Sequence, residues 1–210
     1  MGPVRRRVRT AVPLGVPVGV GLSVAAALLL TGIATDGTGD GAAAATGTRT
    51  VAAVPAAAAA VAAPRARPSA PALTGSDLDG RPVSLPALRG EVVVLSVWGS
   101  GCGPCRAEAD DLALLSGQLR GEEVRFLGIN TRDRDRDAAR SFVRAHGLGF
   151  PSLHDPTGAL LRRFPPAVLS PRTVPSTLVL DRRGRVAVAI GGAVSAEQLR
   201  PLVARLVAEG

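Results

Sequence analysis

One stretch of the 210-residue sequence decides the fold: VLSVWGSGCGPCRAE, residues 94–108. It continues an apolar, mostly β-branched run that begins at Val92 and ends at Trp98, and such a run predicts a strand buried on both faces. Residues 99–103 predict a loop, and a helix is expected over residues 104–120. The two cysteines of the chain, Cys102 and Cys105, therefore lie where a buried strand meets the start of a helix.

The spacing of the two cysteines predicts a redox-active pair. Two thiols at this spacing can close a disulfide across the first helical turn, where Pro104 is tolerated because its missing N–H is not needed. Helix amides and the macrodipole stabilise a thiolate at the first cysteine. We therefore expect Cys102 to be the exposed nucleophile and Cys105, facing the core, to be the resolving thiol. Exchange would pass through a mixed disulfide on Cys102 that Cys105 attacks.

Other uses of a cysteine pair fit this sequence less well. A zinc site needs four ligands, and the two histidines, His146 and His154, are spaced more widely than a usual ligand pair. A copper site also needs a well-placed histidine. A purely structural disulfide would close so short a loop that it would constrain the unfolded chain little. We expect no metal and no other cofactor, with a metal-binding or metal-delivery module as the non-enzymatic alternative.

Composition and charge exclude several classes of function. Aromatic residues make up 2% of the chain and Tyr is absent, which argues against a base-stacking nucleic-acid surface. The absence of Lys excludes Schiff-base chemistry and a P-loop lysine. Residues 73–210 carry 18 Arg and 15 acidic residues, and this modest excess does not require a polyanionic partner. We expect no nucleic-acid partner.

The N-terminal residues 1–34 are typical of a signal peptide or a transmembrane anchor. An arginine cluster at residues 5–9 precedes an uncharged stretch, residues 11–34, which is long enough to span a bilayer. We favour an uncleaved anchor over a cleaved signal, although small residues at 32–34 and 43–45 offer cleavage sites. The positive-inside rule then places the rest of the chain outside the cytoplasm. Residues 35–72, rich in Ala, Gly and Pro, predict a disordered linker.

Residues 73–210 predict one α/β domain. A β-hairpin is expected around the Asp-Gly turn of residues 77–85, and a second strand is expected over residues 124–130. The helix over residues 104–120 should bury Ala109, Leu112, Leu115 and Leu119.

The second half of the domain follows the same alternation. A charged helix is expected over residues 135–146, a hairpin over residues 177–190, and a last helix that a capping box of Ser195 and Gln198 opens. Strands alternating with helices, followed by a terminal hairpin and helix, predict an α/β sandwich.

The stretch around the cysteines resembles the active-site segment of the TlpA/ResA-type thioredoxin-like family, which contains exported, often membrane-anchored thiol–disulfide oxidoreductases. The resemblance covers residues 73–207 and includes residues 79–85, 150–158 and 174–184. It implies a thioredoxin-like fold in which helices flank a central mixed sheet, with an N-terminal β-hairpin and a central insertion.

The same resemblance implies roles for three further residues. Pro175 matches the family's cis-proline, which lies against the disulfide and orients the substrate strand; among peptide bonds, X–Pro bonds tolerate cis. Glu108 matches a glutamate that relays protons to or from the second cysteine, with an ordinary solvated helix residue as the alternative. Trp98 matches an active-site aromatic, with core packing as the alternative.

The sequence departs from the family pattern at two positions. Gly101 stands where the family usually has Trp, which removes a shield over the disulfide and loosens the loop. Asp110 stands where the family often has Pro, so that the expected helix kink would be absent and an extra acid would raise the thiol pKa values.

The family resemblance implies an extracytoplasmic, monomeric protein-disulfide reductase. Its substrates would be protein disulfides, for instance in apocytochrome c before haem attachment, and a membrane thiol relay would supply electrons. A disulfide-forming oxidase would use the same residues, and a thiol peroxidase would need Thr at position 99, where this chain has Gly99. The alternating charges of residues 132–137 predict a solvated helix entrance or a docking surface, and His146 and His154 are expected in surface loops.

Overall fold

The computed structural model describes residues 54–55 and 61–210. The expected N-terminal signal or anchor, residues 1–34, lies outside these residues. None of the helices within residues 61–210 combines the length and the apolar character that crossing a bilayer requires.

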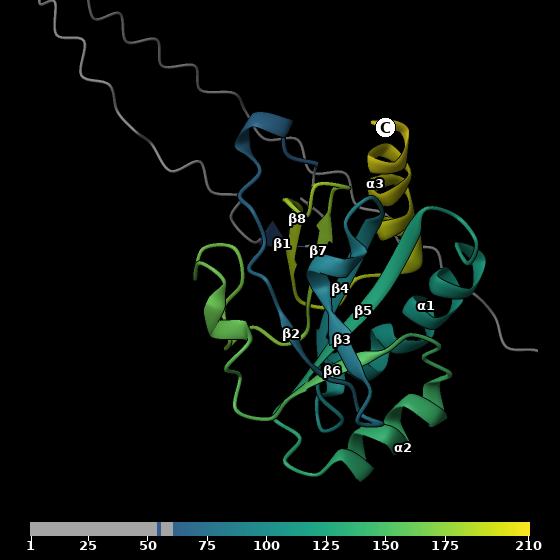
Figure 1. Cartoon of the computed structure of the whole chain (residues 1–210). Coiled ribbons are helices and arrows are strands. Elements are labelled where there is room, and N and C mark those ends of the chain that lie inside the picture. The colour runs from purple at the N-terminus through teal and green to yellow at the C-terminus, as the bar shows by residue number, and fades with distance from the viewer. Residues whose placement is uncertain (1–53, 56–60) are drawn as a thin grey trace, which may run out of the picture. The chain divides into compact units, whose positions relative to one another are not determined.

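A six-stranded mixed sheet forms the centre of the domain (Figure 1). Its strand order is β1-β8-β7-β4-β5-β6. The central strand β4 pairs in parallel with β5 and antiparallel with β7, and β5 pairs in parallel with β6. At the other edge, β8 pairs antiparallel with β7 and in parallel with β1. The strands are β1 (Val54–Pro55), β4 (Val92–Trp98), β5 (Val124–Thr131), β6 (Ser152–Asp155), β7 (Ser176–Leu180) and β8 (Val186–Gly191).

The expected hairpin before the sheet is confirmed. Strand β2 (Thr74–Ser76) pairs antiparallel with β3 (Pro82–Ser84). The Asp77 carboxylate holds the turn because it accepts the backbone N–H groups of Asp79 and Arg81 at 2.9 and 2.8 Å. A 3-10 turn, η3 (Leu85–Leu88), then leads towards β4.

Within residues 61–210, three helices complete the fold: α1 (Gly103–Gln118), α2 (Arg136–His146) and α3 (Ala196–Ala208). Two short 3-10 turns, η2 (Pro64–Ala66) and η4 (Leu161–Arg163), lie in the connections. The capping box of Ser195 and Gln198 at the start of α3 is confirmed. Helix α1 ends two residues before the expected Arg120, a difference of the size that frayed helix ends produce.

The core has two halves, one on each face of the sheet. Alternate residues of β4 enter each half, as the period of a strand requires. Val92, Val94 and Trp98 pack with buried residues of all three helices, including the expected face of α1 at Ala109, Leu112, Leu115 and Leu119. Val93, Leu95 and Val97 pack instead with Leu73, Leu85, Leu161, Phe164, Val168 and Leu169 on the other face. The thioredoxin-like α/β arrangement expected from the sequence is therefore present.

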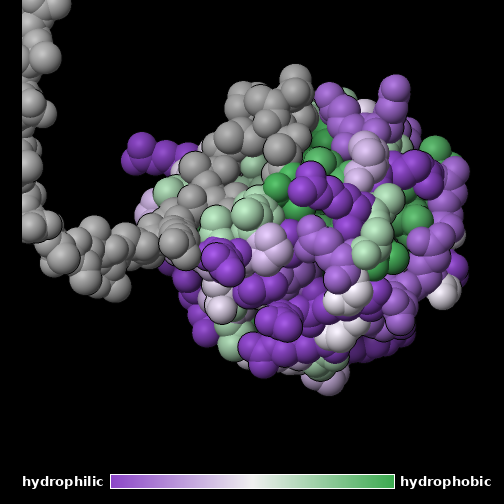
Figure 2. Space-filling model, turned by 90° about the horizontal axis from the view of Figure 1, so that it is seen from above, coloured by the Kyte–Doolittle hydropathy of each residue, from purple (hydrophilic) through white to green (hydrophobic). Residues whose placement is uncertain are grey.

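The packed part of the chain begins earlier than the expected linker boundary at residue 72. Val61 is 8% exposed and Arg67 is 7% exposed. The Ala62 N–H donates to the Ala187 carbonyl of β8 at 2.8 Å, and Ser69 forms a bridge to Arg185. Residues 61–72 thus lie along the β7–β8 hairpin, although their Ala- and Pro-rich composition carries no strand or helix signal. Hydrophilic residues predominate on the end of the molecule that Figure 2 shows.

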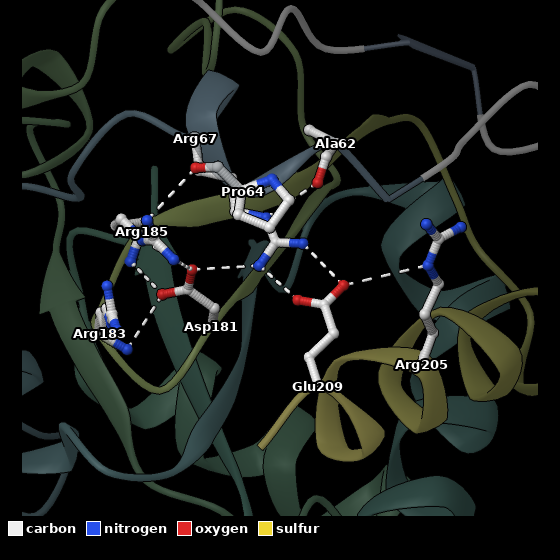
Figure 3. Close-up of polar contacts among 8 residues, drawn as sticks. All are labelled: Ala62, Pro64, Arg67, Asp181, Arg183, Arg185, Arg205 and Glu209. Atoms are coloured by element: carbon white, nitrogen blue, oxygen red, sulfur yellow. Dashed lines mark hydrogen bonds and ion pairs between the residues drawn. The ribbon is translucent and has the colours of Figure 1, made fainter.

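Arg67 links residues 61–72 to Asp181, which follows β7, and to Glu209 at the end of α3 (Figure 3). Its guanidinium lies 3.2 Å from Asp181 Oδ2 and 2.7 Å from Glu209 Oε2, and its Nε donates to the Ala62 carbonyl at 2.9 Å. The hydrogen bond with Glu209 is the main cause that raises the pKa of Arg67 above its ordinary value. Burial alone would raise the pKa of Asp181, but hydrogen bonds from Arg185 and Arg67 bring it below its usual value. Arg67 therefore stays charged in a nearly closed site.

Removal of the Arg67 side chain is expected to destabilise the domain. In Arg67→Ala, the free energy of unfolding in urea should fall by about 2–4 kcal/mol because Glu209 and Asp181 lose a buried partner. Arg81→Ala is the matched control, since Arg81 pairs with Asp79 on the exposed surface, and it should change the free energy by less than about 0.5 kcal/mol. Equal losses in the two variants would contradict this role for Arg67.

Candidate active site

The two cysteines form a disulfide at the N-terminus of α1. Cys102 is the N-cap residue and Cys105 lies in the first turn, with their Cα atoms 5.2 Å apart. The Cys105 backbone N–H donates to Cys102 Sγ at 3.1 Å, so the helix amide that should stabilise a thiolate already points at that sulfur. Cys102 is half-buried, whereas Cys105 is 1% exposed. The expected division into an accessible and a protected sulfur is present.

Pro175 lies beside this disulfide, immediately before β7. The Val174–Pro175 peptide bond is cis, as the family resemblance implies. Cys102 Sγ lies 3.7 Å from the Val174 carbonyl oxygen. Because β7 runs antiparallel to β4, the start of β7 lies beside the end of β4, and Ser176 pairs with Val97. The sheet register therefore brings Val174 and Pro175 to the cysteines from more than 70 residues away.

Glu108 is buried one helical turn after Cys105, and it is not the solvated residue of the alternative interpretation. Glu108 is 2% exposed, and its Oε2 accepts the Val194 backbone N–H at 3.0 Å. Oε1 has no hydrogen-bond partner among the described residues. Burial raises the pKa of Glu108 to about 8, and the single backbone hydrogen bond from Val194 offsets only part of this effect. Positions three apart on a helix lie on one face, so Glu108 and Cys105 face the same core.

Trp98 ends β4 and packs under the active-site segment. Its indole N–H donates to Ser152 Oγ at 3.2 Å, and its ring stacks on Phe142 of α2 with centroids 4.9 Å apart. This contact depends on Gly128, because a Cβ there would lie 2.8 Å from the indole nitrogen and 2.1 Å from Ser152 Oγ. Trp98 therefore has the packing role of the alternative interpretation, and it also contacts the half of the core that contains Cys105.

The loop before Cys102 is held by Asp133. The Asp133 carboxylate accepts the Ser100 backbone N–H at 2.8 Å and the Ser100 hydroxyl at 2.7 Å. It also accepts the side-chain amide of Asn130 at 2.6 Å. The chain reaches this position by turning at Arg132, whose φ is 68° and whose guanidinium donates to the carbonyls of Pro171 and Arg172. The expectation of a merely solvated helix entrance at residues 132–137 is therefore wrong for Asp133.

The two histidines lie in regular secondary structure and not in the surface loops expected from the sequence. His146 is the last residue of α2, and its Nδ1 lies 2.8 Å from Asp110 Oδ1 on α1. The His154 side chain projects from β6, where its Nδ1 lies 3.2 Å from the Asn130 amide oxygen and burial lowers its pKa. Neither histidine lies in a surface loop. Asp110 lies within α1, which continues without a break, and its carboxylate contacts the His146 ring.

Gly99 and Gly101 have opposite surroundings. A Cβ at position 99 would lie 2.7 Å from the Thr131 carbonyl oxygen, a contact with backbone that a side chain cannot relieve. A Cβ at position 101 would meet nothing within 4 Å. The threonine that a thiol peroxidase would place at position 99 is thus sterically excluded, and the position where the family usually has Trp opens to solvent.

The sequence of residues 67–189 matches the AhpC/TSA family. The chain belongs to this family. Among related sequences, the thiol-disulfide oxidoreductase ResA of Bacillus thuringiensis is 26% identical over 137 residues, which is 65% of this chain and 76% of that protein.

Two solved structures are similar to this chain at higher identity. A DsbF homologue from Corynebacterium diphtheriae has a TM-score of 0.63 and 31% identity, and the match covers 81% of this chain and all of that one. A secreted thiol-disulfide isomerase from Corynebacterium glutamicum has a TM-score of 0.62 and 33% identity, with coverage of 71% and 92%. This member of the AhpC/TSA family is a thiol–disulfide oxidoreductase.

Sequence reasoning found the cysteine pair but missed the residues that hold it. No local sequence motif marks the residues that hold the loop, Asp133, Asn130 and Ser100. Their contacts join β5 and the turn after it to the active-site loop, which lies far away in the sequence. One signal was available: Asn130 ends the strand expected over residues 124–130 and Asp133 comes soon after it, at the sheet edge where the parallel strand β4 also ends. No three His, Cys, Asp or Glu side chains of residues 61–210 gather as a metal site would require.

Loss of the Asp133 carboxylate is expected to loosen the active-site loop. In Asp133→Asn, an amide N–H₂ replaces one acceptor oxygen, so the Ser100 amide should exchange its hydrogen about tenfold faster or more. Amide hydrogen exchange of the oxidised chain measures this directly. Asp135→Asn is the matched control, because Asp135 only accepts the Asp137 N–H at the start of α2. Unchanged protection of Ser100 in Asp133→Asn would show that this contact does not hold the loop.

Proposed function

We propose that the protein reduces disulfides in extracytoplasmic proteins through the Cys102–Cys105 couple. The observation that carries this proposal is the pairing of an accessible sulfur with a protected one, beside the Val174 carbonyl and Pro175. A partner sulfur can reach Cys102 from solvent, whereas Cys105 reacts only with Cys102. This asymmetry favours exchange through one defined mixed disulfide.

The proposed reaction moves two electrons from the dithiol to the substrate. The Cys102 thiolate attacks one sulfur of the substrate disulfide, and the other substrate sulfur leaves as a thiolate that takes up a proton. Cys105, once deprotonated, attacks Cys102 Sγ, and the second substrate thiolate leaves. The products are a dithiol substrate and the Cys102–Cys105 disulfide that the structure contains. A dithiol donor then reverses these steps to restore the enzyme.

The surroundings of Cys102 support a role for Val174 and Pro175 in holding the substrate. The segment before β7 ends with the half-buried Val174 and the buried Pro175, and Pro175 has no backbone N–H to donate. The open space at Gly101 lies next to the nucleophile and leaves its sulfur unshielded. We therefore assign the catalytic roles to Cys102 and Cys105. Pro175 would orient the substrate, and Trp98 would support the site by packing in the core beside Cys105.

Glu108 is proposed to carry the proton of Cys105. When Cys105 leaves Cys102 during reduction of the enzyme, the protonated form of Glu108 can donate to it; when Cys105 attacks, the carboxylate can accept its proton. The raised pKa, about 8, keeps both forms accessible near neutral pH. The unpartnered Oε1 leaves one oxygen free for this exchange.

We place the domain outside the cytoplasm, held by residues 1–34 as a membrane anchor through the Ala-, Gly- and Pro-rich stretch that follows them. The arginine cluster at residues 5–9 and the uncharged stretch that follows support this arrangement. The description of one relative as secreted agrees with export. A membrane thiol relay would supply electrons, apocytochrome c is one protein of the required substrate class, and the protein would act as a monomer.

The direction of electron flow is tested by the reduction potential of the full chain. Equilibration with glutathione or dithiothreitol should give a potential below about −230 mV, in the range of reducing thioredoxin-fold proteins. A value near −120 mV, as in a strong oxidant, would overturn the reductase proposal and favour the disulfide-forming alternative.

Two cysteine variants complete this test. Cys105→Ser should accumulate the mixed disulfide with a substrate, because the resolving thiol is gone, and Cys102→Ser should form none. Non-reducing gels and mass spectrometry would detect the adduct. Adducts of equal yield on the two variants would contradict the assignment of Cys102 as the nucleophile.

The proton transfer from Glu108 predicts a pH dependence. The rate at which a dithiol reduces the Cys102–Cys105 disulfide, divided by the thiolate concentration, should fall about tenfold as pH rises through about 8, because the donor form of Glu108 is lost. Glu108→Gln should lack this decline. Asp110→Asn, which changes an exposed carboxylate on the same helix, should retain it.

A stability measurement gives an independent check of the same group. Because the folded pKa of Glu108 lies above its ordinary value of 4.5, the folded state holds a proton that the unfolded state releases. The contribution of Glu108 to stability is therefore full below pH 4.5 and declines as pH rises towards 8. Glu108→Gln should remove that decline; an identical pH profile in the variant would argue against the raised pKa.

A further inference from the structure

A cavity of about 520 Å³ lies beside the turn that joins β7 to β8. Register places it far from the disulfide: Leu180 at the end of β7 pairs with Val93 at the start of β4, whereas Cys102 follows the end of β4. The two sites are separated by the length of β4, which at a strand's rise is about 20 Å. The cavity is lined by five arginines, Arg65, Arg67, Arg182, Arg183 and Arg185, and by two carboxylates.

The two carboxylates of the cavity are already saturated (Figure 3). Asp181 Oδ1 accepts the backbone N–H groups of Arg183 and Arg185, both at 3.0 Å. Asp181 Oδ2 accepts Arg185 Nε at 2.8 Å and Arg67 Nη1 at 3.2 Å. Both Glu209 oxygens lie within 2.8 Å of the Arg67 guanidinium. Each Asp181 oxygen thus has two donors, and Glu209 is paired with Arg67 and lies 4.0 Å from Arg205.

The arginines, by contrast, have donors to spare. Arg65 and Arg183 are exposed, and their guanidinium groups form no hydrogen bond or ion pair with the described residues. Arg182 already donates to Glu123 and to the carbonyls of Gly90 and Val207, and its buried Nε has no partner among the described residues. Among the side chains that line it, the cavity therefore presents more guanidinium groups than carboxylates. A ligand that fits it must be negatively charged and must accept several hydrogen bonds.

We propose that this cavity binds a phosphate group. Guanidinium groups bind phosphate oxygens in pairs, and Arg65 and Arg183, which form no ion pair with the described residues, line the same cavity. The volume lies in the range of small-ligand sites and exceeds what free phosphate alone requires, so a phosphate ester fits. The ester has two sources, a soluble phosphate compound and the headgroup of an anionic phospholipid.

The lipid source would also orient the domain, and this part rests on the proposed membrane anchor. The segment that begins at Val61 lines the cavity at Pro64 and Arg65. A headgroup bound there would hold this end against the bilayer and direct Cys102, at the other end of β4, away from it.

Calorimetric titration of the full chain in neutral detergent with inorganic phosphate tests the site. We expect saturable binding that weakens about tenfold or more in Arg65→Gln/Arg183→Gln. The matched control is Arg134→Gln/Arg163→Gln, which removes the same charge at two exposed arginines outside the cavity and should change the affinity by less than about twofold. The rate of reduction of the Cys102–Cys105 disulfide reports that each variant is folded.

The same titration in doped micelles separates the two sources. If phosphatidylglycerol abolishes phosphate binding and an equal charge of fatty acid does not, the lipid headgroup occupies the site. If neither competes, the ligand is a soluble phosphate compound. Absence of saturable binding, or an equal loss in the two double variants, would overturn the proposal, and neither result would bear on the activity of the distant cysteines.

Discussion

Strand β4 is hydrogen-bonded on both sides, parallel to β5 and antiparallel to β7, and the whole site depends on this pairing. The antiparallel neighbour brings Val174 and Pro175 to the end of β4 from one side. The parallel neighbour brings Asn130 to Trp98 from the other side, and the turn after it delivers Asp133 to the active-site loop. Because a shift of one residue would reverse every side chain of β4 between the two halves of the core, the register is fixed by burial.

Two carboxylates near the cysteines show how local surroundings set different roles. Asp133 accepts three hydrogen bonds and so acts as a fixed acceptor that holds the loop. Glu108 accepts one hydrogen bond in an apolar site, so its charged form is disfavoured and its pKa rises. The first group orients the backbone before the nucleophile, and the second is suited to exchange a proton. The residue type alone does not distinguish them; the number of donors around each does.

Much of the fold could be predicted from the sequence because its signals are local. The β-branched run of β4, the Asp-Gly turn before β3 and the capping box of α3 each lie within a few residues. The positions of Cys102 and Cys105 follow from the strand and the helix that flank them. Arg67 could not be predicted, since its partners lie 114 and 142 residues away and its neighbours read as linker. Asp133 was hidden for a related reason, because alternating charges usually mark a solvated surface.

Trp98 is the single tryptophan of the chain, and the chain contains no tyrosine. It is 2% exposed, stacks on Phe142 and belongs to the same half of the core as Cys105. Indole emission from this protein therefore arises from one ring, four residues before the nucleophile, with no background from elsewhere. The packing that supports the active site also gives the protein an intrinsic fluorophore there, so that the redox state of the cysteines can be followed optically without any added label.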